Sequence, residues 1–370
     1  MTANPLSEHL RKLIARNGPL TVARYMEEAL LHPEHGYYTG REPFGRQGDF
    51  ITAPEVSQVF GELTGLWCAA AWQQMGSPGK IALVEFGPGR GTLMADALRA
   101  TRIVPGFADA LDIHLVEASP RLRELQRETL AGVEVTWHET PDTLPARSAL
   151  MIGNEFFDAL PIRQLVFRAD GWKERCIGWD DKESRFVWTE QPAEPGLAAL
   201  VPASAGHPHP GAVFEISIAA RDHMSTIAAH LAAQGGTGLF IDYGHGRSAY
   251  GDTFQAVRAH RPVDVLDAPG SADLTAHVDF DALQIRAHAA GCTCFGTITQ
   301  GNFLTALGLE ARTEQLLRNA TDSQAAALRS GARRLIEPAE MGTLFKVIAV
   351  AAPDIDELPG FGPPRDLART

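Results

Sequence analysis

The chain has few cysteines, no long apolar run and no excess of basic charge. Its four cysteines, Cys68, Cys176, Cys292 and Cys294, form no CxxC pair and no cluster at metal spacing, so we expect buried free thiols. No apolar run approaches the roughly 20 residues that cross a bilayer. The formal net charge of -12 argues against a nucleic-acid binder with a basic surface. We therefore expect no membrane span and no nucleic-acid partner.

Two further absences concern targeting and metal binding. Residues 1–6 lack the charged and apolar pattern of a signal peptide, and Glu8 disfavours a transit peptide, so we expect a cytoplasmic protein. His207 and His209 lie between prolines with no third ligand nearby, so we expect loop residues and no metal site. A chain of 370 residues with 45% hydrophobic content can bury a large core, as one domain with insertions or with a smaller second domain.

Three glycines spaced two residues apart follow a short apolar segment. Residues 81–84 are typical of a buried parallel strand, which runs into Glu85 and then into Gly87, Gly89 and Gly91. Apolar residues at helical spacing come next. We therefore expect a strand, a glycine turn and a helix, with bare backbone against which a nucleotide-type ligand can lie.

The order of residues in this turn separates the possible ligands. Thr92 stands where a dinucleotide fingerprint has its third glycine, and no Lys-Ser/Thr pair follows, as a P-loop requires. The pattern E-x-G-x-G-x-G, with Pro88 between the first two glycines, resembles motif I of class I S-adenosylmethionine (AdoMet) methyltransferases. In that pattern Glu85 would hold a positively charged amine. A glycine turn without a ligand is the alternative.

A second strand candidate, residues 111–116, ends in Glu117, roughly 30 residues after the first glycine. An acid at this place in a doubly wound sheet accepts hydrogen bonds from ribose hydroxyls, in NAD and AdoMet enzymes alike. The alternative is a solvated surface acid. We expect further strands over residues 133–137, 149–153, 238–245, 292–299 and 341–350.

The segment before this core is rich in aromatic, glycine and polar residues without a regular period. It includes Tyr37, Tyr38, Phe50 and Thr52, and loops of this kind are often lids or binding edges. We predict these four as substrate or lid residues. Thr52 with Glu55 also forms a predicted capping box for the following helix.

The sequence Asn154 to Pro161 follows the fourth expected strand. Ligands of open parallel sheets bind beyond the carboxyl ends of the strands, so we place Asn154 at the cofactor, and Glu155 and Asp158 at the reaction centre. Both carboxylates can grip a guanidinium, although Asp158 or Asn154 could equally cap a helix. His245, after the fifth strand, is the best-placed general base.

Several motifs in one order resemble the MidA family, which includes mitochondrial complex I assembly-factor methyltransferases and bacterial relatives. The matching segments are residues 36–38, 48–57, 85–92, 154–161, 273–280 and 299–304. The resemblance implies a class I methyltransferase fold, AdoMet as cofactor and a protein arginine as acceptor, with a complex I subunit as one candidate. It also implies a cover near the active site that brings His277 to the reaction.

The resemblance implies an α/β protein with a Rossmann-like, doubly wound, mostly parallel seven-stranded sheet. Glu139 and Asp142, after the third strand, could bind the adenine amine or be loop acids. We divide the chain at its composition changes into the following parts: N-terminal helices and lid loop (1–75), AdoMet-binding core (76–162), inserted antiparallel β meander and linker (163–215), second part of the core (216–352) with a cover segment (246–280), and a tail (353–370) without a core role.

Two other functions fit the same residues. One is hydride transfer with NAD, against which Thr92 and Glu85 weigh. The other is a non-catalytic AdoMet-binding chaperone that contacts its partner through exposed aromatics such as Tyr37, Tyr38 and Trp188. The sequence leaves the oligomeric state open, with a homodimer as one option.

Overall fold

The computed structural model describes residues 4–40, 52–194 and 196–367. The chain forms two compact units. Unit 1 comprises Met1–Phe50, Asp158–Asp222 and Arg247–Asp279, and unit 2 comprises Ile51–Phe157, His223–Gly246 and Phe280–Thr370. Phe50, a predicted lid residue, lies outside the described residues.

Unit 2 is built on a sheet in the order β15-β16-β10-β5-β2-β3-β4. Its strands are β2 (Ile81–Phe86), β3 (Leu111–Val116), β4 (Val135–His138), β5 (Ala149–Asn154), β10 (Gly236–His245), β15 (Thr293–Thr299) and β16 (Phe345–Ala351). The five strands from β4 to β10 are parallel, whereas β16 pairs antiparallel with both β10 and β15. This order confirms the predicted fold class.

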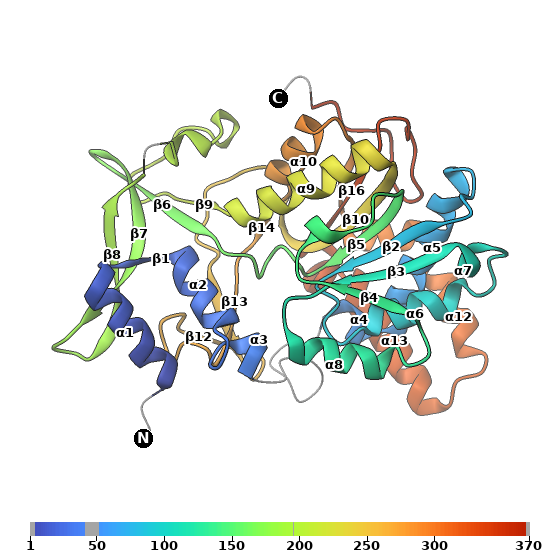
Figure 1. Ribbon diagram of the computed structural model, residues 1–370, viewed down its shortest axis with the longest axis horizontal. Coiled ribbons are helices and arrows are strands. Elements are labelled where there is room, and N and C mark those ends of the chain that lie inside the picture. The colour runs from blue at the N-terminus through green and yellow to red at the C-terminus, as the bar shows by residue number, and fades with distance from the viewer. Residues whose placement is uncertain (1–3, 41–51, 195, 368–370) are drawn as a thin grey trace. The chain divides into compact units, whose positions relative to one another are not determined.

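Helices cover both faces of this sheet, with α10 on one side and α6 and α8 on the other (Figure 1). The helices are α4 (Ala53–Val56), α5 (Gln58–Gln74), α6 (Thr92–Thr101), α7 (Phe107–Ala110), α8 (Pro120–Thr129), α9 (Ile218–Gln234), α10 (Phe280–Ala289), α11 (Gln300–Ala306), α12 (Leu309–Leu317) and α13 (Asp322–Ile336), with short turns η1 (Pro141–Thr143) and η4 (Pro338–Gly342). Because both faces are covered, every residue of β2 and β5 is buried.

Unit 1 contains the predicted antiparallel meander. Its larger sheet has the order β1-β7-β6-β9, with β8 paired to β7. The elements are α1 (Pro5–Asn17), β1 (Leu20–Thr21), α2 (Val22–Leu31), α3 (Tyr37–Gly40), β6 (Arg163–Arg168), β7 (Gly171–Asp180), β8 (Arg185–Pro192), η2 (Ala198–Leu200), η3 (Ala203–Ala205) and β9 (Val213–Ile216). One core cluster of this unit buries Leu6, Tyr25, Ile177 and Phe186 together.

The predicted cover segment contains short strands that were not among the expected strands. It contains β11 (Gln255–Arg258), β12 (Arg261–Val263), β13 (Asp273–Thr275) and β14 (Val278–Asp279), of which the first three form an antiparallel sheet in the order β12-β11-β13. These strands are two to four residues long, too short to show a period of two. β11 and β12 pair as a hairpin that turns at Ala259 and His260, whose φ values are 50° and 59°, and β13 pairs with β11 from farther along the chain.

Local capping divides two helical regions of unit 2. Thr52 is the N-cap of α4 but its side chain makes no cap hydrogen bond, and Ser57 starts a separate helix by accepting from the N–H of Val59. The predicted Thr52–Glu55 capping box is therefore wrong. Residues 309–336 are likewise divided into α12 and α13, the second of which begins with a capping box of Thr321 and Gln324.

The tail does contribute to the core of unit 2, contrary to the prediction. Trp67 Nε1 donates to the carbonyl of Pro359 at 2.9 Å, and Leu358 is buried. The Phe361 ring lies 5.3 Å from that of Phe303. The prolines of the tail conceal these contacts because they break any period in the sequence. Across the described segments, we find no helix with the length and apolar character that a membrane span requires.

Candidate active site

The glycine turn between β2 and α6 has the backbone conformation that its sequence requires. Gly87, Gly89 and Gly91 have φ of 59°, 53° and 81°, in the left-handed region that favours glycine. The N–H of Gly91 donates to the carbonyl of Pro88 at 2.7 Å, which closes the turn. A Cβ added at Gly87 would lie 3.1 Å from Cδ2 of Phe156. Side chains are thus excluded where the backbone faces the ends of β2 and β5.

Glu85 supplies a buried carboxylate beside this turn. The residue is 3% exposed, and its Oε2 has no hydrogen-bond partner among the described residues. Burial raises the pKa of Glu85 to about 8, although the N–H of Met94 donates to the carboxylate and lowers it. An unpaired buried carboxylate is costly unless a cation or donor satisfies it. Glu85 therefore fits a ligand that carries an ammonium group.

Glu117 occupies the end of β3 in a network that the sequence did not predict. Its carboxylate accepts from the N–H of Ser119 at 2.8 Å and from Nε2 of Gln126 at 3.2 Å. Burial raises the pKa of Glu117 to about 6. Each carboxylate oxygen has a second lone pair, so Glu117 can still accept from ligand hydroxyls.

Gln126 of α8 connects this acid to the glycine turn. Its side chain is fully buried, its Nε2 also donates to the carbonyl of Gly89 at 2.8 Å, and its Oε1 accepts from Nε1 of Trp137 at 2.9 Å. A signal for Gln126 exists in the sequence, because it follows Leu122 by four residues and so shares its buried helix face. Gln126 was not among the predicted site residues because glutamine is usually exposed.

The residues after β5 are held by an acid of β10. The carboxylate of Asp242, which is fully buried, accepts from the N–H groups of Phe156 and Phe157 at 3.1 and 2.9 Å. This contact positions the Phe156 ring, whose centroid lies 5.5 Å from that of Phe86. Asp242 lies within the strand expected over residues 238–245, and no role was predicted for it. It is a positioning residue for this segment.

Asn154 and Glu155 lie in the same segment. Nδ2 of Asn154 donates to Oε1 of Glu155 at 3.0 Å, and the N–H of Ala53 donates to the same oxygen at 3.0 Å. Glu155 thus caps α4 in place of Thr52, and its φ of 51° is unusual for a residue with a side chain. The chain keeps this strained residue at the carboxyl end of a buried strand, which is typical of functional sites.

Three other predicted residues of unit 2 are more accessible. Glu139 and Asp142 are exposed, after β4 and in η1, and His245 at the end of β10 is half-buried. The structure therefore brings the glycine turn, Glu85, Glu117 and the Asn154–Glu155 segment to the carboxyl ends of adjacent parallel strands. It leaves Glu139 and Asp142 facing solvent.

The remaining predicted residues belong to unit 1. Tyr37 is fully buried and Tyr38 half-buried, so these are not exposed aromatics as expected. The hydroxyl of Tyr38 donates to Oδ1 of Asp273 at 2.8 Å, and burial together with the charges of Asp273 and Asp158 raises the pKa of Tyr38 well above its ordinary value. Tyr38, Asp158 and Asp273 therefore form an acidic cluster.

His277 lies beside this cluster in the chain. The backbone N–H of His277 donates to Oγ1 of Thr253 at 2.9 Å, and the N–H of Ala276 donates to the carbonyl of Asp158 at 3.0 Å. These two bonds fix the backbone from Ala276 to His277 within unit 1. The His277 side chain is half-buried.

The site of unit 2 suits a nucleoside that carries an ammonium group. The glycine turn offers backbone without side chains against which the ligand can lie. The buried Glu85 carboxylate matches the ammonium group, and Glu117 at the end of the next strand matches the ribose hydroxyls. AdoMet has this composition, and when bound it supplies a methyl group on a sulfonium. The residues present therefore fit AdoMet.

Comparison with known proteins agrees. The profile of a family described as S-adenosyl-L-methionine-dependent methyltransferases matches residues 63–298. A structure from Burkholderia thailandensis bound to S-adenosyl-homocysteine superposes with a TM-score of 0.85, at 33% identity over 98% of this chain and 96% of that one. The expected cofactor is thereby confirmed, and NAD is set aside.

Two curated relatives are named protein arginine methyltransferase NDUFAF7. The Drosophila melanogaster homologue is 37% identical over 96% of this chain and 88% of its own, and the Homo sapiens protein is 34% identical over 94% and 83%. Both names carry the word mitochondrial, which contradicts the predicted cytoplasmic location. The resemblance drawn from the sequence motifs is confirmed. The chain belongs to this family of S-adenosyl-L-methionine-dependent methyltransferases.

Proposed function

We propose that this chain transfers a methyl group from AdoMet to an arginine side chain of a protein. The observation that carries the proposal is the similarity to relatives named protein arginine methyltransferase, at 34 to 37% identity over nearly the whole chain. The acceptor that we propose first is a subunit of respiratory complex I, on the family resemblance of the motifs.

The geometry of unit 2 supports the cofactor roles that we propose. Glu85 pairs with the ammonium group, the backbone at Gly87, Pro88, Gly89 and Gly91 faces the ligand, and Glu117 accepts from the ribose hydroxyls. Asn154 contributes at the end of β5, where its Oδ1 is buried and has no hydrogen-bond partner among the described residues. Glu139 and Asp142 remain the proposed partners of the adenine amine.

The acceptor roles follow from charge. A guanidinium is protonated in water, so carboxylates both hold it and orient one nitrogen for in-line attack on the methyl carbon. We propose Glu155 and Asp158 for this task, with Tyr37, Tyr38, Phe50 and Thr52 as lid or substrate contacts. His245 and His277 are the proposed acceptors of the proton that the nitrogen loses. Of the two carboxylates, we propose Glu155 first as the partner of the guanidinium, because its neighbours hold its strained backbone in place.

A methylation assay tests this function directly. Complex I subunits and arginine-bearing peptides would be incubated with AdoMet carrying a labelled methyl group, and modified residues identified by mass spectrometry. We expect methylarginine with the wild-type chain and at least a roughly tenfold lower rate with Glu155→Gln. Loss of the same mark from cells that lack the protein would identify the acceptor.

The control separates catalysis from cofactor binding. Affinity for S-adenosyl-homocysteine should be nearly unchanged in Glu155→Gln, since Glu155 is assigned to the acceptor. A chain that binds AdoMet and an acceptor protein but leaves no mark on arginine would instead be the non-catalytic chaperone, and the proposed activity would be rejected.

A further inference from the structure

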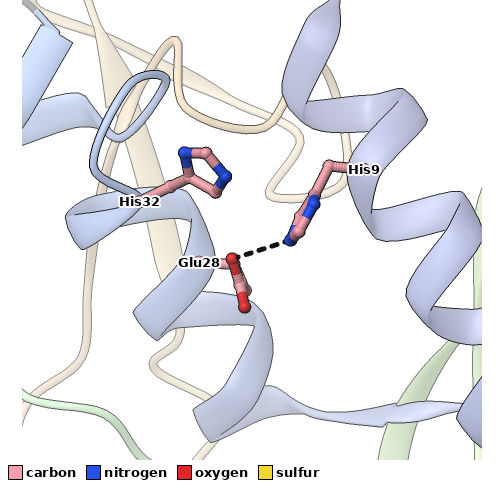
Figure 2. A group of neighbouring side chains, drawn as sticks. All are labelled: His9, Glu28 and His32. Carbon is pink, nitrogen blue, oxygen red and sulfur yellow. Dashed lines mark hydrogen bonds and ion pairs between the residues drawn. The ribbon is translucent and has the colours of Figure 1, made fainter.

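Three side chains with metal-ligand chemistry converge between α1 and α2 in unit 1 (Figure 2). His9 lies on α1, Glu28 on α2, and His32 is the C-cap of α2. One possible ligand atom from each lies within 4.8 Å of the other two, and Nε2 of His9 is 3.1 Å from Oε2 of Glu28. The sequence predicted no metal site, and this cluster has no local signal because His9 is distant in sequence from the other two.

The helical spacing explains how the cluster forms. Glu28 and His32 are four residues apart, so both lie on the face of α2 that His9 approaches from α1. The Glu28 side chain is 10% exposed and that of His9 is 38% exposed. The cluster therefore consists of a nearly buried carboxylate and a histidine that solvent reaches. A cation can therefore enter without unfolding either helix.

The donor set selects the class of cation. Two imidazoles and one carboxylate suit zinc and neighbouring divalent transition metals, whereas magnesium and calcium prefer oxygen ligands. Donor atoms around tetrahedral zinc are about 3.3 Å apart, so a group whose atoms lie within 4.8 Å of one another must contract by up to roughly 1.5 Å. Side-chain rotation can supply a change of this size.

Two existing contacts oppose the cation. Arg24 pairs with Glu28, and Nδ1 of His32 accepts from the N–H groups of Glu34 and His35 at 3.2 and 3.3 Å. Figure 2 shows Nε2 of His32 turned toward His9, so coordination there displaces a proton and costs those two long hydrogen bonds. We therefore expect a dissociation constant on the order of 1–10 μM.

We propose that His9, Glu28 and His32 bind one zinc-class divalent cation, with water in the remaining position. The site would fasten α1 to the end of α2. The carbonyl of His32 accepts from the N–H of Gly36 at 2.8 Å and from Oγ1 of Thr39 at 2.6 Å. A cation on His32 would therefore also steady the turn that leads to Tyr37 and Tyr38.

Calorimetric titration of the full chain, without an affinity tag, tests the site. We expect one Zn²⁺ per chain, a rise in melting temperature with Zn²⁺, and no binding of Mg²⁺. His32→Gln and Glu28→Gln should each weaken Zn²⁺ binding by roughly tenfold or more. The double variant His207→Gln/His209→Gln, which removes two exposed loop histidines, should bind as the wild type does.

Folding is checked in each variant by circular dichroism and by S-adenosyl-homocysteine affinity, which depends on unit 2. His9→Gln provides a third variant if one of the others misfolds. The proposal is overturned if the folded wild type takes up no Zn²⁺, or if His32→Gln and His9→Gln bind as tightly as the wild type. It is likewise overturned if the loop variant alone loses binding.

Discussion

Gly87 combines a left-handed backbone with a close neighbour, so a side chain there has two costs. Its φ is 59° and an added Cβ would meet the Phe156 ring at 3.1 Å. We expect Gly87→Val to weaken S-adenosyl-homocysteine binding more than roughly 100-fold, since the side chain would push into the ligand-facing turn. Isothermal calorimetry measures this affinity.

Gly132→Ala is the matched control for backbone strain. Gly132 also has a positive φ, 87°, but a Cβ there meets nothing within 4 Å. We expect that variant to lose about 1 kcal/mol of stability and no affinity. Equal affinity in Gly87→Val and the wild type would show that the turn does not hold the cofactor.

The buried carboxyl of Glu85 predicts a pH dependence of stability. Its pKa is about 8 in the folded, ligand-free chain against an ordinary 4.5, because burial disfavours the charge. Between these values the folded state keeps a proton that the unfolded state releases. Stability contributed by this group therefore falls as pH rises from 4.5 to 8, by at most about 1.4 kcal/mol per pH unit.

Glu85→Gln cannot titrate and should remove this dependence. Urea unfolding at pH 5, 6.5 and 8 should show the variant gaining stability relative to the wild type as pH rises, while its S-adenosyl-homocysteine affinity falls roughly tenfold. Parallel pH profiles for the two proteins would mean that Glu85 already carries its charge in the free chain.

At the scale of elements, strands that are buried along their whole length could be predicted and short paired strands could not. Residues 111–116 form a strand with the predicted bounds, and the other predicted strands of this sheet differ by at most four residues at either end. By contrast, β11 and β12 form a hairpin turned at Ala259 and His260, which lack the Asn or Gly that marks such a turn, and β13 pairs with β11 from about 16 residues away. The parallel sheet could therefore be predicted from the sequence, whereas the short strands of the cover segment could not.

The same difference applies to the site. Glycines and acids at strand ends are local signals, so Glu85, Gly87 and Glu117 could be chosen from the sequence. Contacts between elements could not: Gln126 joins α8 to the glycine turn, Asp242 holds the segment after β5, and Glu155 caps α4. Such hydrogen bonds join residues up to 102 positions apart.

Gln126 gives a prediction about elements, because it joins α8 to the ends of β2, β3 and β4. Gln126→Met keeps the volume but leaves Glu117, Gly89 and Trp137 short of a partner, at a cost of roughly 1–3 kcal/mol for each buried group. We expect lower stability and roughly tenfold weaker S-adenosyl-homocysteine binding, measured by calorimetry. Glu128→Gln, on the exposed side of α8, should change neither. Unchanged affinity in Gln126→Met would limit this network to a structural role.

At the scale of the whole chain, each unit is assembled from three segments that alternate along the sequence. Contacts between distant segments define each unit, so the sequence alone does not show which segments belong together. The distribution of cysteines offers a way to follow the units separately. Cys176 belongs to unit 1, while Cys68, Cys292 and Cys294 belong to unit 2, and all four are buried free thiols, as the sequence predicted.

These thiols should be inert in the folded chain and should report unfolding unit by unit. Burial raises the pKa of Cys176 and Cys294 to about 12, that of Cys292 to about 11, and that of Cys68 further, so few thiolates exist at neutral pH. We expect a thiol reagent to label almost none of the four thiols in the native chain and all four in denaturant.

In a urea series with brief labelling, S-adenosyl-homocysteine should delay labelling of the three thiols in unit 2, because a ligand stabilises the unit that binds it. Delay of Cys176 by the same increment would show that the units unfold together, whereas fast labelling in water would refute the buried positions themselves.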